Sequence, residues 1–162
     1  MSIQFDKVQP KTKEQLKQLI NYAFKHDIYD LNFIDTSKIT NMCELFEYVE
    51  HDFNVSSCDV SNVTYMNGIF NSCFRFKGKG LENWNVSNVT SMYSMFTACE
   101  NFEGKGLENW DISNVVSLRN MFKGCENFDC DFSKWNVSNV VDTTNMFYGC
   151  TSLKNKPRWY KE

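Results

Sequence analysis

Hydrophobic and polar residues follow the same order several times along the chain. In one copy the apolar positions are Val89, Met92, Met95, Phe96 and Cys99. The phenylalanine of this set recurs every 24 to 26 residues, at Phe46, Phe70, Phe96, Phe122 and Phe147. A period of this length is typical of repeat proteins, because so short a unit buries its apolar face only by stacking on its neighbours. The pattern predicts about five stacked coils.

Each copy predicts two short elements. Counted from Val89, the apolar residues fall at offsets 0, 3, 6, 7 and 10, which lie on one side of an α-helix. The segment before them, Trp84-Asn-Val-Ser-Asn-Val89, alternates and contains β-branched residues, which favours an extended strand. We therefore expect an α/β repeat solenoid in which each coil has a short strand and a short helix.

The two ends of the chain lack the repeat. Residues 1–32 contain the capping box Thr12-Lys-Glu-Gln15, followed by apolar residues at helical spacing, and they predict an N-terminal capping helix at about 12–25. Residues 33–153 form the predicted repeat solenoid, and residues 154–162 form a predicted C-terminal cap. We expect the three parts to build a single structural domain.

Two polar columns repeat as regularly as the apolar ones. They consist of Ser37, Ser61, Ser87, Ser113 and Ser138, and of Asn62, Asn88, Asn114 and Asn139. One interpretation is a row of polar ligands or glycosylation sites, since several of these asparagines fit Asn-x-Ser/Thr. The favoured interpretation is a ladder of side chains that pairs with the backbone groups of stacked turns.

The cysteines also follow the repeat. Cys73, Cys99, Cys125 and Cys150 occupy one apolar column, and the chain has seven cysteines and two histidines in all. No Cys-x-x-Cys pair occurs, so the clustered ligands of a zinc site are not visible and we expect no bound metal. The column is best explained by small buried residues. Free thiols favour a reducing compartment.

Composition narrows the classes of partner. The 162 residues carry a net charge of −3 without a basic run, which argues against nucleic acid as the partner. No apolar stretch is long enough to span a membrane. The first residues do not show the positively charged segment followed by an apolar segment that is typical of a signal peptide. We therefore expect a cytoplasmic monomer as the sequence stands, and a surface or secreted protein if a leader has been removed.

The sequence offers no catalytic motif. Gly78-Lys-Gly80 lacks the spacing of a phosphate-binding loop and predicts a turn. There is no Gly-x-Ser-x-Gly elbow, and both histidines lie outside the clear repeats, away from any repeated Ser or Cys. We expect a protein without enzymatic activity and without a cofactor.

Between the regular apolar columns lie positions that vary from copy to copy. Their offsets place them on the outer side of each predicted helix, free of core constraints. Tyrosine and arginine are enriched at protein interfaces. The predicted partner-binding residues are Tyr65, Tyr93, Arg119, Lys123 and Tyr148. The alternative is the strand side of the coils, with Asn85, Asp111 and Asn136.

The repeated motif Trp-Asn/Asp-Val/Ile-Ser-Asn-Val, followed by Met/Leu-x-x-Met-Phe-x-x-Cys, resembles the repeat of the BspA-like leucine-rich-repeat surface proteins. The same module occurs in mycoplasma-type lipoproteins of unassigned function. The resemblance covers residues 33 to about 153. It implies a leucine-rich-repeat-like solenoid of bacterial, protist or viral origin, active in adhesion or protein binding, with no catalytic residues to carry over. The chain departs from the typical member by lacking a leader and by its Phe-x-Gly-Lys-Gly-Leu loop.

Together these observations predict a non-enzymatic protein-binding module for interaction or adhesion. One alternative is an immunity or inhibitor protein that binds a toxin or effector. Another is a carbohydrate-binding or purely structural surface protein, in which the aromatic residues of the tryptophan column (Trp84, Trp110, Trp135) would stack on sugars. Packing of this column between coils is the favoured interpretation.

Overall fold

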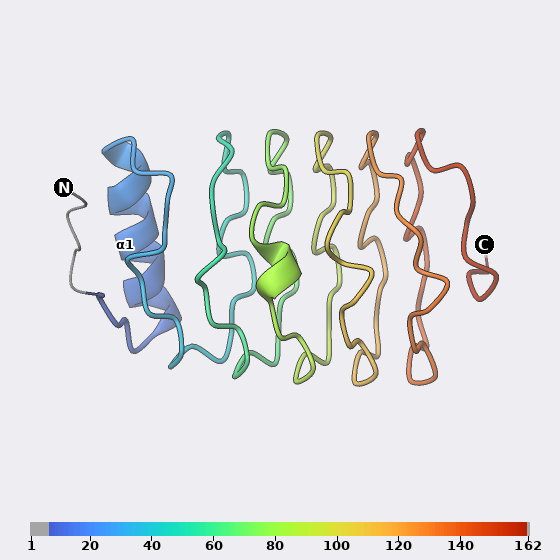
Figure 1. Cartoon of the computed structure of the whole chain (residues 1–162), viewed down its shortest axis with the longest axis horizontal. Helices are drawn as coiled ribbons and strands as arrows, with labels where there is room; N and C mark the ends of the chain where they lie inside the picture. The colour runs from blue at the N-terminus through green and yellow to red at the C-terminus, as the bar shows by residue number, and fades with distance from the viewer. Residues whose placement is uncertain (1–6, 162) are drawn as a thin grey trace.

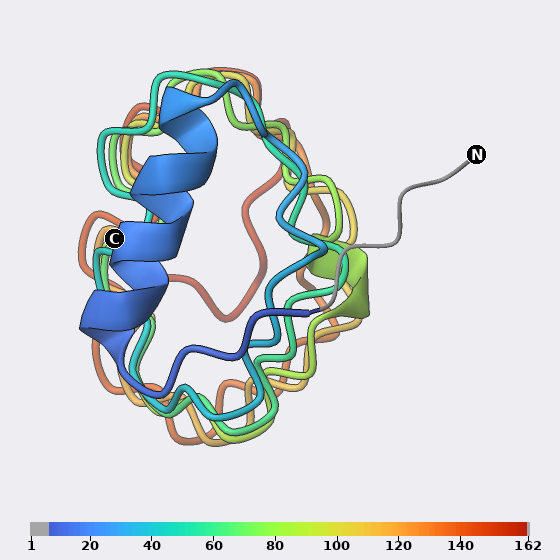
Figure 2. The ribbon, with the colours of Figure 1, turned by 90° about the vertical axis from the view of Figure 1, so that its left-hand side faces the viewer.

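The chain winds into a row of coils that lie side by side along one axis (Figure 1). The computed structural model describes residues 7–161. Helix α1 (Lys13–Lys25) lies at the N-terminal end of the row, and one turn of 3-10 helix, η1 (Leu81–Asn83), lies on one side. Seen from the end of α1, successive coils superimpose around a closed oval (Figure 2).

The predicted strand and helix in every coil are wrong, and with them the α/β solenoid. Among residues 7–161, α1 and η1 are the only helices, and strand pairing is limited to isolated parallel bridges. Four of these bridges link one position of successive coils, in the order Asn41, Tyr65, Ser91, Ser117 and Asp142. The segment Trp84–Val89, expected to be a strand, instead contains a tight turn in which the N–H of Val89 donates to the carbonyl of Val86 at 2.9 Å.

Overlapping tight turns take the place of the predicted helix. In the third coil, the N–H groups of Met95, Thr97 and Cys99 each donate to the carbonyl three residues earlier, at 3.1–3.2 Å. Ser94 (φ 53°) and Ala98 (φ 57°) adopt the left-handed conformation. Such residues interrupt a right-handed helix, because L-residues enter this region only singly. The turns nevertheless bury the same side of the segment as a helix would.

The remaining N–H groups of this segment bond to the next coil. Those of the third coil donate to the carbonyls of Ser117, Arg119, Met121 and Lys123 at 2.7–3.2 Å. A helix that began at Val89 would have used most of these donors internally. Here alternate donors close turns within the coil and form a ladder between coils, so the backbone of each interior coil is paired on both sides.

The core is a file of stacked phenylalanine rings. The ring centroids of Phe70 and Phe96 are 5.3 Å apart, and those of Phe96 and Phe122 are 5.6 Å apart, with nearly parallel planes. Phe96 and Phe122 are buried completely, and Phe147 is 4% exposed. The prediction that these phenylalanines lie buried in one file is confirmed.

Side chains of the other columns also link neighbouring coils. The tryptophans are buried, and each donates its Nε1–H to a backbone carbonyl of the preceding coil, as Trp110 does to Leu81 at 3.0 Å. The column cysteines donate to phenylalanine carbonyls, as Cys99 does to Phe70 at 3.0 Å. Asn88 donates to the carbonyl of Ser61 at 2.7 Å, so the predicted asparagine ladder exists, although its members are exposed.

Helix α1 begins where the capping box predicts. Thr12 Oγ1 accepts a hydrogen bond from the N–H of Gln15 at 3.3 Å, and Gln15 Oε1 accepts one from the N–H of Lys11 rather than of Thr12. The buried side of the helix consists of Leu16, Ile20 and Ala23. These side chains cover the core at the first coil, and the capping helix expected at about 12–25 is confirmed.

Candidate protein-binding face

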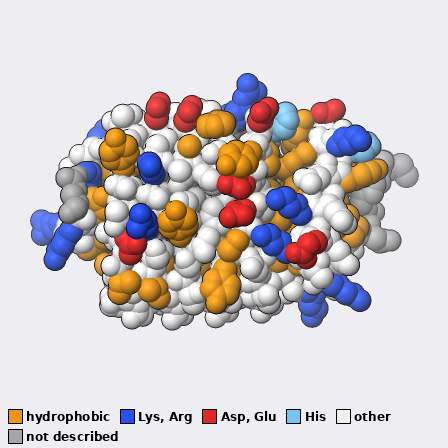
Figure 3. Space-filling view, turned by 180° about the vertical axis from the view of Figure 1, so that it is seen from behind, with side chains coloured by type: hydrophobic (Ala, Val, Ile, Leu, Met, Phe, Trp, Pro, Cys, Tyr) orange, Lys and Arg blue, Asp and Glu red, His pale blue; other side chains and the backbone are white. Residues whose placement is uncertain are grey.

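The turn segments of the five coils form one continuous side of the molecule. We call this side the turn face and define it by the outward residues of 41–48, 65–72, 91–98, 117–124 and 142–149. Residues 91–98 lie half a coil after Leu81–Asn83, which places the turn face opposite η1. Figure 3 shows this side, where exposed hydrophobic side chains are scattered among charged groups of both signs.

The predicted binding residues all lie on the turn face. Tyr65, Tyr93 and Tyr148 are 49%, 43% and 68% exposed, Arg119 is exposed, and Lys123 is half-buried. Each tyrosine therefore presents a large ring surface, while the backbone that carries it is held by the ladder.

The structure brings some of these residues together and separates others. Tyr93 and Arg119 occupy the same position in adjacent coils, two residues after the bridged pair Ser91 and Ser117. Lys123 Nζ lies 5.8 Å from the centre of the Tyr148 ring, in the range of a cation–π contact. Tyr65 lies in the second coil, three coils away from Tyr148. A partner must therefore cover several coils to contact all of them.

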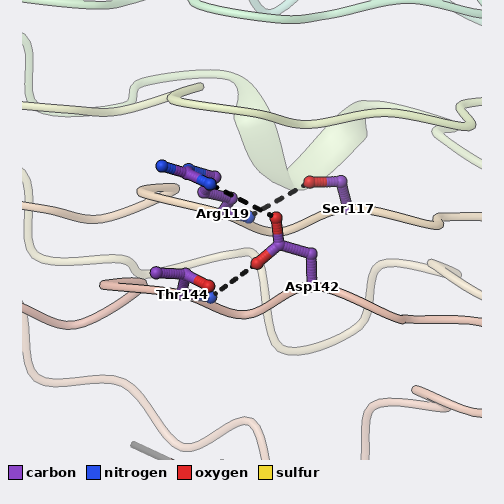
Figure 4. Close-up of polar contacts among 4 residues, drawn as sticks. All are labelled: Ser117, Arg119, Asp142 and Thr144. Carbon is purple, nitrogen blue, oxygen red and sulfur yellow. Dashed lines mark hydrogen bonds and ion pairs between the residues drawn. The ribbon is translucent and has the colours of Figure 1, made fainter.

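Polar contacts hold Arg119 in the fourth coil of this face (Figure 4). Its guanidinium lies 4.0 Å from a carboxylate oxygen of Asp142, and the backbone N–H of Arg119 donates to Ser117 Oγ at 3.4 Å. The other oxygen of Asp142 accepts the N–H of Thr144 at 2.9 Å, and hydrogen bonding to Thr144 lowers the pKa of this carboxyl. Because the ion pair is long and exposed to solvent, it favours one orientation of the Arg119 side chain but does not hold it rigidly.

Two further residues belong to the turn face; the sequence places Asn67 among its variable outward positions without a role, and Tyr48 was missed. Asn67 Oδ1 accepts hydrogen bonds from the Ser91 hydroxyl at 2.6 Å and from the N–H of Tyr93 at 3.1 Å, so it supports the tyrosine. Tyr48 is 66% exposed in the first coil, at a left-handed position (φ 63°). The degenerate first copy of the repeat hides Tyr48, whereas Asn67 occupies the same variable column as Tyr93 and Arg119.

The alternative face uses its polar atoms locally. The side-chain oxygens of Asn85, Asp111 and Asn136 accept the N–H groups of Ser87, Ser113 and Ser138 at 3.0–3.2 Å. Hydrogen bonds from Ser113 also lower the pKa of Asp111. These side chains are exposed but already hold turns, which favours the turn face as the binding surface.

The chemistry of the remaining groups is consistent with a scaffold. The thiols are free, and burial raises the pKa of Cys73 and Cys150 to about 12 and that of Cys99 and Cys125 well above the usual value. A nucleophilic cysteine needs the opposite shift. Within the described residues no group of three His, Cys, Asp or Glu side chains is arranged to hold a metal ion, and no helix has the length and apolar character of a membrane span.

Comparison with known proteins gives a single kind of match. No curated protein and no solved structure matches the chain. A family model described as "Mycoplasma protein of unknown function, DUF285" matches residues 14–102 and again residues 69–161. The two matches overlap by more than one coil, as expected for a repeat, and together they reach from α1 into the C-terminal tail. The mycoplasma-type repeat is supported in this way, whereas the match does not extend to the BspA-like leucine-rich repeats. The chain belongs to this DUF285 family.

Proposed function

We propose that this protein is a non-enzymatic module that binds another protein through the turn face. The observation that carries the proposal is the set of three strongly exposed tyrosines, Tyr65, Tyr93 and Tyr148, on a backbone that is hydrogen-bonded from coil to coil. Tyrosine supplies a large contact area at a small entropic cost, and a rigid backbone lowers the cost of ordering further.

Arg119 and Lys123 extend this surface. Both lie in the fourth coil, between Tyr93 and Tyr148 along the stack, so the aromatic and cationic side chains form one surface across three coils. Arginine is enriched with tyrosine among residues that dominate binding energy. A partner with acidic and aromatic groups matches this mixture, and adhesion is one use of such a surface.

A sugar-binding platform built on the tryptophan column has little support. Trp84, Trp110 and Trp135 are each 5% exposed and donate to carbonyls of the preceding coil. Their rings are therefore occupied in packing between coils. The buried, free thiols favour a reducing compartment, and we propose the cytoplasm for the chain as it stands.

The experiment compares two variants of the protein, each with two substitutions. Tyr93→Ala with Arg119→Glu alters the turn face, and Asp111→Ala with Asn136→Ala alters the opposite polar column. The immobilised chain captures its partner from a lysate of the source cell, and the captured protein is then purified and titrated against each variant. We expect the first variant to weaken binding at least tenfold with an unchanged melting transition, and the second to bind normally. Loss of binding only in the second variant would contradict the proposal.

A further inference from the structure

The charge of the turn face changes along the stack. Its first coil carries Glu44 and Glu47, its second and third coils carry no charged residue, and its fourth coil carries Arg119 and Lys123. The fifth coil has one charged residue, Asp142, which lies 4.0 Å from Arg119. The face therefore has a negative first coil and a positive fourth coil, separated by two neutral coils that bear exposed tyrosines.

Most of these charges form no ion pair within the chain. Glu47 accepts a hydrogen bond from Asn71 Nδ2 at 2.7 Å, and Lys123 Nζ lies 5.8 Å from the centre of the Tyr148 ring, but neither has an oppositely charged partner within residues 7–161. Glu44 is exposed and likewise forms no ion pair in this part of the chain. A well-matched partner therefore brings the reverse order of charges.

A second copy of the chain supplies this reverse order when it runs antiparallel along the stack. A twofold axis parallel to the coils, between the second and the third, reverses the order of the coils and keeps the place of each residue along its coil. The first coil of one copy then faces the fourth coil of the other, and the second coil faces the third. Because the coils lie in a straight row, the two faces meet over all four coils (Figure 1). An axis along the stack would instead bring like charges together, which is costly.

Residues at matching places in this register complement one another. Counted from the bridged residue of their coil, Glu47 and Lys123 both stand six positions later, so they face each other at two symmetric contacts. Each tyrosine of these coils faces a smaller residue, and the pairs are Tyr48 with Gly124, Tyr65 with Ser91, and Tyr93 with Asn67. Large side chains opposite small ones allow the close fit that protein interfaces show.

The fifth coil fits the same register. It extends past the first coil of the other copy, where α1 lies on the side opposite η1 (Figure 2). Helix α1 carries three lysines and one carboxylate, namely Lys13, Lys17, Lys25 and Glu14. Asp142 therefore approaches a positive segment, and no charged coil of the turn face meets a segment of its own sign.

We propose that two copies of the chain associate antiparallel through their turn faces, with Glu47 of each copy against Lys123 of the other. A second copy is then the partner of the surface assigned in the proposed function, on which this inference rests, and it brings the acidic and aromatic groups that match that surface. Four short segments on each side make a small contact, so the dimer is weak and forms only at high concentration. It takes the place of the monomer expected from the sequence.

Self-association of the full chain tests the proposal. Analytical ultracentrifugation from about 1 µM to about 1 mM should show a monomer at the low end and a dimer at the high end. Glu47→Lys and Lys123→Glu each place like charges at both symmetric contacts, and each should weaken association at least tenfold. Lys134→Glu is the control, because Lys134 precedes the tryptophan column as Asn83 of η1 does and lies away from the turn face. It should associate as the unchanged chain does.

An equimolar mixture of the two single variants identifies the contact. In a mixed dimer the two substitutions face each other at one contact and the two unchanged residues face each other at the other, so opposite charges meet at both. The mixture should therefore associate as tightly as the unchanged chain. The variant that carries both substitutions should do so on its own, which also shows that neither substitution prevents folding.

The dimer is overturned if the chain stays monomeric at every concentration or if both single variants associate like the unchanged chain. It is also overturned if neither the mixture nor the doubly substituted variant recovers. The proposed function is tested separately, by whether Tyr93→Ala with Arg119→Glu loses the protein captured from the lysate. A monomeric chain whose turn face still captures a different protein keeps the proposed function and excludes only the second copy as its partner.

Discussion

At the N-terminal end, α1 lies along the first coil and buries Leu16, Ile20 and Ala23 over the core, with its own backbone bonded internally. At the C-terminal end, residues 151–161 cover the core with Pro157, Trp159 and Tyr160 but form no regular element (Figure 1). Both ends therefore close the apolar interior. They differ in the backbone groups that are left without a partner within residues 7–161. At the first coil these are carbonyls, along which α1 lies; at the last coil they are the N–H groups of Thr143, Asn145, Phe147 and Gly149.

The difference shows that a stack of coils has two separate surfaces to close at each end. Apolar side chains are covered by whatever brings hydrophobic area, whether a helix or an irregular segment. The polar ladder is closed only by an element that pairs with it or excludes other chains from it.

The largest loss of stability is expected from truncating a phenylalanine in the middle of the stack, and the loss at either end can be compared with it. Phe96→Ala removes a ring that is packed between two coils, and it should lower the free energy of unfolding by about 3–5 kcal/mol. Phe147→Ala should cost less, because the tail beside it has room to collapse into the space. Urea denaturation monitored by circular dichroism measures both. An equal loss for the two variants would show that the C-terminal end is packed as rigidly as the interior.

The second prediction compares the two caps directly. Ile20→Ala on α1 should destabilise the protein by about 2–5 kcal/mol, because Ile20 is 1% exposed. Trp159→Ala in the tail should have a smaller effect, since Trp159 is only half-buried. Thermal unfolding of the two variants ranks the caps. A more severe loss from Trp159→Ala would reverse the assignment of α1 as the stronger cap.

The third prediction concerns the start of α1. Thr12→Ala removes the hydroxyl that accepts the N–H of Gln15, and it should cost about 1 kcal/mol. Thr12→Ser keeps the acceptor and serves as the control. If the two variants have the same denaturation midpoint, the cap contributes nothing to the N-terminal closure.

The smallest effect is expected at the tail. Asp129 accepts hydrogen bonds from Lys154, which lower the pKa of its carboxyl below the usual 3.8. Its contribution is complete above the ordinary pKa and is lost as the pH falls through the lowered one. We expect acid to speed amide exchange in the tail, after correction for intrinsic rates. Asp129→Asn should produce the same loosening at pH 7 without affecting α1. A tail that is insensitive to both changes would rule out this anchor.

Much of the side-chain arrangement is predictable from the sequence. The period, the buried phenylalanine file, the packed tryptophans and the capping helix all follow from the spacing of apolar residues, which is set by what must be buried. The prediction of a helix within each coil was wrong, because overlapping turns bury side chains at the same sequence offsets as a helix does. The left-handed positions carried a signal in Gly68, Asn120 and Asn145, since Gly and Asn tolerate positive φ.

The functional surfaces were predictable to different degrees. Tyr93 and Arg119 are visible in the sequence because they vary at positions between buried columns, and the structure places both outside the core. The unpaired N–H groups of Thr143, Asn145, Phe147 and Gly149 in the last coil are not visible, because every residue except proline has a backbone N–H group. Only the direction of the ladder shows which donors lack partners.

The bonds between tryptophan and the preceding coil also determine how such a chain changes in length. Trp110 donates to Leu81, and Trp135 to Leu107, so each bond spans a little more than one repeat. Removing a few residues within a coil would move every later tryptophan, phenylalanine and cysteine away from its acceptor or ring. Duplicating or deleting a whole repeat would preserve all of these pairings. Length in this architecture therefore changes in whole coils.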